Sequence, residues 1–117
     1  MDELVQWLGE QIDEDERIAK EAGGRRGQWK LATGLDDAEL GDASWLRPPY
    51  LKHVERHDPA RVLAEIDAKR DLLVFAKGIH DHHETFTTGV YARLEKTLRL
   101  YALAYKNRPG YRDEWRP

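Results

Sequence analysis

The segment from Asp58 to Ala76 constrains the fold most, because it carries every local signal of a helix with a defined start. Asp58 is placed as the N-cap, where its carboxylate can accept a hydrogen bond from a backbone N–H that the helix leaves unpaired. Pro59 follows at the first helical position, where its missing N–H has no cost. Apolar residues then recur on one face at Val62, Ile66, Leu73 and Ala76. The sequence therefore predicts a helix over residues 59–77, ended by Gly78.

Two further segments have helical periodicity. Residues 2–22 open with two acids, which favour a helix start, and end before Gly23 and Gly24. The apolar face of this segment is formed by Leu4, Leu8, Ile12 and Ala19. Residues 88–106 carry a stripe formed by Val90, Leu94, Leu98, Tyr101 and Tyr105. A helical turn or short helix is also expected over residues 50–56.

Residues 28–46 lack this periodicity. Trp29 and Leu31 alternate with polar neighbours, and residues 43–46 form a second short apolar segment, a pattern typical of half-buried strands. Two short strands are marginally stable alone and would have to pack on the helices. The predicted fold class is mainly α, with a three-helix core from residues 2–22, 59–77 and 88–106 and a small β-hairpin or irregular insertion at 28–46. A chain of 117 residues is expected to form a single domain over 1–117.

Composition excludes several classes of protein. The chain has no cysteine, so disulfides and thiolate metal sites are excluded. It opens with Met1, Asp2 and Glu3, which are acidic where a targeting segment would be basic, and it contains no long apolar run. We therefore expect a cytoplasmic protein without membrane association.

The net charge of −3 is unevenly distributed along the chain. Residues 1–22 contain eight acidic and two basic side chains, whereas residues 85–117 contain seven basic and three acidic ones. The interpretation we favour is that the first and last helices pack side by side and complement each other. The alternative is two separate surfaces for different partners. The negative total and the lack of a recognition-helix pattern argue against a nucleic-acid partner.

Histidines supply the candidate metal sites. His53 and His57 are four residues apart, a spacing that can chelate zinc or nickel on a helix, although Pro59 argues against a continuous helix through both. The second candidate lies in a polar connection over residues 79–86 and comprises His80, Asp81, His82, His83 and Glu84. We interpret these residues as structural or solvated and expect no cofactor. The alternative is a metal-binding or metal-dependent hydrolytic protein.

No arrangement typical of catalysis is present. The chain has no glycine-rich phosphate loop, no credible Ser-His-Asp arrangement and no cysteine nucleophile. The pairs Glu10–Asp13 and Glu55–Asp58 have the three-residue spacing of helical magnesium sites. With 22 acidic residues in the chain, such pairs arise by chance. We therefore expect a protein without enzymatic activity.

Aromatic residues beyond those that the helical stripes need indicate a binding surface. They are Trp7, Trp45, Tyr50 and Trp115, and we expect their side chains to be exposed. The alternative is that the tryptophans cover a small core. Aromatic residues and arginine are enriched at the centres of protein interfaces. The sequence thus predicts a non-enzymatic module that binds another protein, and homo-oligomer formation is a further possibility.

Four motifs, together with the acidic first helix, carry a family resemblance. They are His53-x-x-x-His57-Asp58-Pro59-Ala60-Arg61-Val62-Leu63, Ala68-Lys69-Arg70, Thr97-Leu98-Arg99-Leu100-x-Ala102 and Pro109-x-Tyr111-Arg112-x-Glu114-Trp115-Arg116-Pro117. In these motifs the chain resembles a family of small proteins of unknown function from actinobacteria and their phages. The resemblance implies a phage or prophage accessory protein acting on a host component, and it implies no particular activity.

The chain departs from that family at one place. Many members of the family carry several cysteines between the central and last helices, spaced like zinc ligands, whereas residues 77–86 here contain none. The resemblance therefore implies either that a zinc site is lost and replaced by helix packing, or that imidazole and carboxylate groups have replaced the thiolates. We favour the loss.

Overall fold

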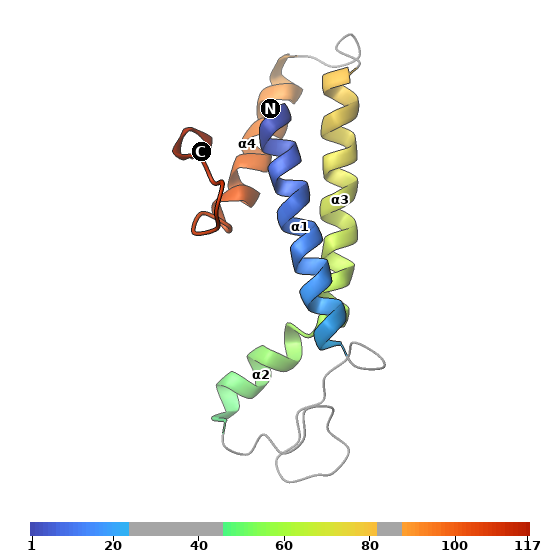
Figure 1. The fold of residues 1–117 in the computed structure, drawn as a ribbon, viewed down its shortest axis with the longest axis vertical. Helices are drawn as coiled ribbons and strands as arrows, with labels where there is room; N and C mark the ends of the chain where they lie inside the picture. Colours follow the sequence, from blue (N-terminus) through green and yellow to red (C-terminus); the bar gives the residue numbers. More distant parts are fainter. Residues whose placement is uncertain (24–45, 82–87) are drawn as a thin grey trace. The chain divides into compact units, whose positions relative to one another are not determined.

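The computed structural model describes residues 1–23, 46–81 and 88–117, and these residues are mainly helical (Figure 1). The elements are α1 (Asp2–Ala22), α2 (Pro48–Arg56), α3 (Pro59–Asp81), α4 (Thr88–Leu103) and the 3₁₀ turn η2 (Asp113–Trp115). No strand occurs among the described residues. The mainly α fold class is therefore confirmed. The hairpin predicted at 28–46 lies outside the described residues except for Leu46, which is not in a strand.

The chain divides into two compact units. The first comprises Met1–Asp13 and Ala68–Pro117 and is called the core unit, and the second comprises Glu14–Asp67 and is called the α2 unit. Because the division falls within α1 and within α3, each of these helices contributes residues to both units.

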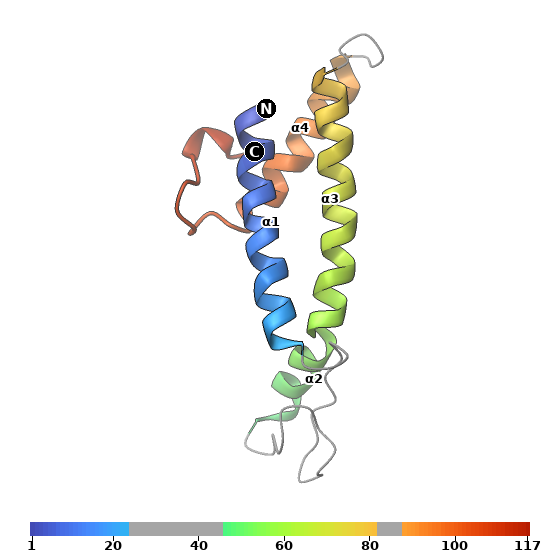
Figure 2. The same ribbon diagram turned by 45° about the vertical axis from the view of Figure 1, so that its right-hand side comes forward.

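Three helices enclose the hydrophobic core of the core unit. Within this unit α1, α3 and α4 run side by side in both views (Figures 1 and 2). Ala76 of α3 and Leu98 and Ala102 of α4 have no exposed surface. The other buried members of the same cluster are Leu4, Trp7, Leu8, Leu94, Tyr105 and Trp115. The predicted packing of the first, central and last helices around one core is therefore present in this unit.

The buried face of α4 differs from the predicted stripe at three positions. Leu94, Leu98 and Tyr105 are buried as predicted, but Val90 and Tyr101 are 40% and 41% exposed. Ala102 lies in the core in their place. An alanine adds little to a hydrophobic pattern, although a small side chain suits a tightly packed helix contact.

Two helix ends also differ from their predicted positions. α4 ends at Leu103 instead of residue 106, because residues 104–106 donate their N–H groups to carbonyls three residues back, at 2.9–3.2 Å, and so form a tightened turn. α3 continues beyond the predicted stop at Lys77 and ends at Asp81. Gly78 lies within α3 and does not end it. Among the described residues, Gly110 is the one glycine with a positive φ.

The start of α3 confirms the predicted cap. The Oδ1 atom of Asp58 accepts a hydrogen bond from the backbone N–H of Arg61 at 3.0 Å. This bond pairs one of the N–H groups that the first turn of a helix leaves without a partner. Arg61 also forms an ion pair with Glu65, one turn later, at 2.9 Å.

In the α2 unit, α2 begins with Pro48 and Pro49 and covers the short helix predicted over 50–56. Leu51 is buried there, and Leu46 and Val54 pack against it. In the part of α1 that belongs to this unit, Arg17 contacts Glu14 at 2.6 Å and Glu21 at 2.9 Å. The hydrogen bond to Glu14 and its charge raise the pKa of Arg17, whose guanidinium is already protonated at every physiological pH.

Candidate functional site

The structure corrects two of the four predicted aromatic anchors. Trp7 and Trp115 are each only 7% exposed and belong to the core, so the prediction that they are exposed is wrong. Their ring centroids lie 5.4 Å apart, and Tyr111 packs against both, at 5.8 and 5.9 Å. A small core can bury aromatic residues from a chain end as readily as from a helix stripe. Helical periodicity does not show Trp115, because residues 104–117 follow the end of α4. Trp7 lies three residues after Leu4 on the same face of α1, so periodicity is consistent with its burial.

The other two predicted anchors have different outcomes. Tyr50 of α2 is 53% exposed, with the guanidinium of Arg47 5.8 Å from its ring centroid. Trp45 lies outside the described residues. Tyr50 is thus the one predicted anchor whose exposure the described structure supports.

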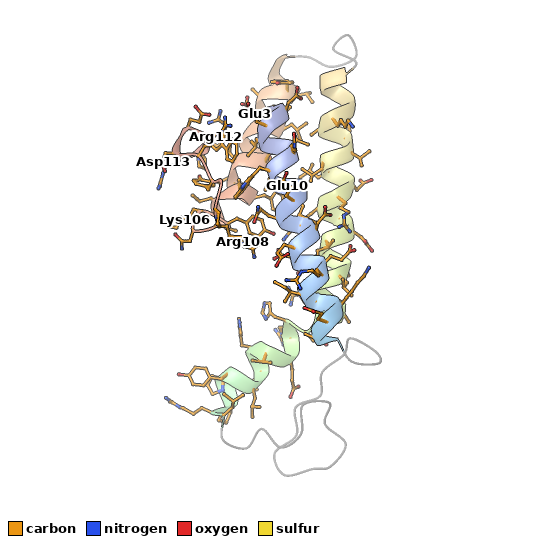
Figure 3. All side chains as sticks on the ribbon, in the orientation of Figure 1. Glu3, Glu10, Lys106, Arg108, Arg112 and Asp113 are labelled. Atoms are coloured by element: carbon orange, nitrogen blue, oxygen red, sulfur yellow. The ribbon has the colours of Figure 1, made fainter. Side chains whose placement is uncertain are left out.

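The segment after α4, residues 104–117, is called here the C-terminal strap. It lies along the N-terminal half of α1, and Figure 3 shows its charged residues on the same side of the core unit as Glu3 and Glu10. The indole Nε1 of Trp7 donates a hydrogen bond to the carbonyl of Pro109 at 3.1 Å. Gly110 follows with a φ of +91°, and a Cβ at this position would lie 2.5 Å from the same Nε1. A glycine is therefore needed where the strap crosses α1.

An ion pair and several hydrogen bonds attach the strap to both neighbouring helices. Arg112 forms a salt bridge with Glu3 of α1, and Arg99 of α4 donates to the carbonyl of Glu114 at 2.7 Å. Arg108 contacts the side-chain oxygen of Gln11 at 3.3 Å, and its guanidinium lies 4.6 Å from the ring centroid of Tyr105. The salt bridge between Arg112 and Glu3 joins the basic end of the chain to its acidic start, with the basic partner in the strap instead of in the last helix.

The Tyr111 hydroxyl is a buried polar group of the strap. It has no hydrogen-bond partner in the described part of the chain. An unpaired buried hydroxyl usually costs stability. The aromatic packing of this ring therefore offsets a polar penalty.

A surface depression of about 340 Å³ lies at the N-terminal end of α1. Its lining consists of Met1, Asp2, Glu3, Leu4, Glu95, Arg99, Glu114 and Trp115. Glu3 and Glu114 both pair with Arg112, and Glu95 pairs with Arg99 at 3.1 Å. These three carboxylates therefore neutralise arginines, which leaves them poorly placed to act as an acid–base pair.

The structure also bears on the candidate metal ligands. The rings of His53 and His57 are stacked with centroids 4.3 Å apart, and the Nδ1 of His57 lies 2.8 Å from the carbonyl oxygen of His53. This nitrogen is therefore a hydrogen-bond donor, which removes it as a metal ligand. The described residues contain no group of three or more side chains placed to hold a metal.

The second histidine cluster lies outside the described side chains, as do Asp81 and Glu84. It comprises His80, His82 and His83. Elemental analysis of protein purified without a histidine tag tests the metal-binding alternative directly.

The two carboxylate pairs whose magnesium-type spacing is attributed to chance each have a structural role. Asp13 forms an ion pair with Arg70 of α3 at 2.6 Å, and Asp58 caps α3. Each pair thus has one carboxylate engaged in the fold.

One exposed surface was missed by the sequence patterns. Arg93, Lys96 and Leu100 follow one another at spacings of three and four residues along α4, and all three are exposed. These three residues are called here the α4 outer face. Neither cation forms a hydrogen bond or ion pair within the described part of the chain. The signal available in the sequence was the lack of acids, since Glu95 is the only acidic residue between 88 and 107 and it pairs with Arg99.

The fold and these surfaces define a small helical protein whose C-terminal strap completes its core against α1. Residues 1–117 match the model of a family of unknown function (DUF6221), and the chain belongs to this family. The resemblance to a family of unknown function is therefore confirmed. Searches among curated proteins and among solved structures give no significant match. Within the described ranges no helix combines the length and the apolar character needed to cross a membrane.

Proposed function

We propose that this protein is a non-enzymatic module that binds another protein. In line with the family resemblance, we further propose that it acts in the cytoplasm as a phage or prophage accessory protein and that its partner is a host component. The family match assigns no activity, so the proposal depends on the surface of the molecule.

The observation that carries the proposal is a set of large apolar side chains on the outer surface of the core unit. Val74 of α3 is 70% exposed and Leu100 of α4 is 48% exposed, each beside an exposed aromatic residue, Phe75 and Tyr101. The core is complete without them, since Leu98 and Ala102 fill it from α4. Two consecutive exposed apolar residues on each of two helices favour contact surfaces more than single scattered residues do.

Site-specific photo-crosslinking in actinobacterial cells tests this function. A photoreactive phenylalanine analogue replaces Val74 in one variant and Leu100 in another. We expect at least one of the two variants to yield a discrete adduct with another protein, because a bound partner covers its position.

A matched control carries the same analogue at Ala64, an exposed residue of α3 in the α2 unit. The control is expected to give no adduct of the same mass. Identical adduct patterns at all three positions, or no adduct at Val74 and Leu100, would contradict a binding function for this surface.

A further inference from the structure

We propose that the α4 outer face binds an acidic amphipathic helix of another protein. This inference rests on the proposed binding function and adds the chemistry of the partner. Some cations of the core unit contact acids or aromatic rings, whereas Arg93 and Lys96 have no such contact among the described residues.

Several cations of the core unit are engaged within it. Arg99 contacts Glu95, and Arg112 contacts Glu3. Lys69 lies 5.9 Å from the ring centroids of both Tyr101 and Tyr105. Arg93 and Lys96 have no such contact in the described part of the chain, so their charges are available to a partner.

The spacing of the face defines the shape of the partner. Positions three and four apart share one face of a helix, and residues 93–100 extend over roughly 10 Å of helix axis. Leu100 supplies an apolar contact at one end of this array. A partner helix with acidic residues at the same spacing, next to an apolar residue, would pair with both cations and cover the leucine.

A second copy of the chain fits this face poorly. Two copies of the face would bring Arg93 and Lys96 of one chain against the same cations of the other. Like charges in contact oppose association. A contact with a different surface of a second copy is heterologous and would produce rings or open chains of molecules, which the size of the protein in solution distinguishes from a one-to-one complex with a partner helix.

Nucleic acid fits less well than an acidic protein helix. The chain has a net charge of −3, so its overall field repels phosphates. The exposed leucine gains little from a phosphate backbone, whereas it gains from an apolar residue on a helix.

Selection from a displayed library of random 16-residue peptides tests the chemistry of the partner. We expect the enriched peptides to carry acidic residues at spacings of three and four, beside a leucine-like residue. The double substitution Arg93→Glu and Lys96→Glu should weaken binding of an enriched synthetic peptide by about tenfold or more, because two attractive contacts become repulsive.

The control is the double substitution Lys52→Glu and Lys77→Glu, which changes the net charge equally at exposed lysines of α2 and α3. It should leave the affinity within about twofold, and melting curves should show that both double variants fold. An enriched set without acidic bias, equal weakening by both double variants, preferential binding of a 16-base DNA strand, or a concentration-dependent dimer lost with Arg93→Glu would overturn the proposal.

Failure here can be separated from failure of the binding function. If Leu100 still yields a specific photo-adduct in cells while the selected peptides lack acidic residues, the module binds a partner of different chemistry. If neither result is obtained, both proposals are wrong.

Discussion

The C-terminal third of the chain contains two groups of basic residues with opposite roles. Arg99, Arg108 and Arg112 point into contacts that attach the C-terminal strap to α1 and α4. Arg93 and Lys96 lie on α4 itself, one or two turns from Arg99, and form no such contact among the described residues. The net charge of the segment does not distinguish the two groups, because position on the helix decides which cation meets an acid.

The comparison shows how a small chain can use one type of residue for both stability and recognition. Arg112 of the strap neutralises Glu3 of α1. Arg108 and Arg99 hold the strap by hydrogen bonds to Gln11 and to the carbonyl of Glu114. The α4 outer face retains cations beside an exposed leucine, where they contribute little to folding. The same division between inward and outward positions applies to the apolar residues of α4, where Leu98 is buried and Leu100 is exposed.

The largest expected effect separates two leucines of α4 that are two residues apart. Leu98 has no exposed surface and Leu100 is 48% exposed. Leu98→Ala should lower the free energy of unfolding by roughly 2–5 kcal/mol, because it leaves a cavity in the core. Leu100→Ala should change it by less than about 0.5 kcal/mol. Urea unfolding followed by circular dichroism measures both, and equal losses would place Leu100 in the fold instead of on a free surface.

The next effect concerns the crossing of the strap over α1. Gly110→Ala should lower the free energy of unfolding by roughly 1–3 kcal/mol, because the new methyl group would collide with the Trp7 indole at a backbone position with positive φ. Gly78→Ala is the control, since a Cβ there would meet no atom within 4 Å and the residue is helical. That control should stabilise the protein slightly. A neutral Gly110→Ala would show that the strap is not held against Trp7.

These effects also show which parts of the fold could be predicted from the sequence. The start of α3 was predictable because Asp58, Pro59 and the apolar stripe are local signals that act within a few residues. The burial of Trp115 was not, because it depends on a contact between the two ends of the chain. Trp7 had a local signal that the predicted stripe left out, since it lies three residues after Leu4 on the same face of α1. Trp7 donates its hydrogen bond to Pro109, 102 residues away in sequence.

The candidate surface was less predictable than the fold. The stripe of α4 assigned Tyr101 to the core and gave no role to Leu100, because periodicity identifies an apolar face but not which edge of it a neighbouring helix covers. The exposed tyrosine of α2 was predicted correctly. The surface on α4 depends on which cations contact acids, and those contacts are set by the folded chain and not by local spacing.

A smaller effect is expected at the cap of α3. Asp58→Ala should lower the free energy of unfolding by roughly 0.5–2 kcal/mol, because it leaves the Arg61 N–H without its acceptor, whereas Asp58→Ser or Asp58→Asn should cost less. The control is Asp71→Ala, at an exposed aspartate inside α3, which should be nearly neutral. Thermal and urea unfolding measure the series. Indistinguishable Ala, Ser and Asn variants at position 58 would contradict the capping role.

The smallest expected effect tests the two groups of cations directly. Arg112→Gln removes the salt bridge to Glu3 and should cost roughly 0.2–1 kcal/mol, a small value because both side chains are largely exposed. Arg93→Gln should leave stability unchanged within measurement error, since its guanidinium contacts no described acid. A double-mutant cycle with Glu3→Gln isolates the first contribution, and 1 M salt should reduce it, because the screening length falls to about 3 Å. If Arg93→Gln costs as much as Arg112→Gln, Arg93 has a partner within the fold, and the α4 outer face is not available for binding in the form proposed here.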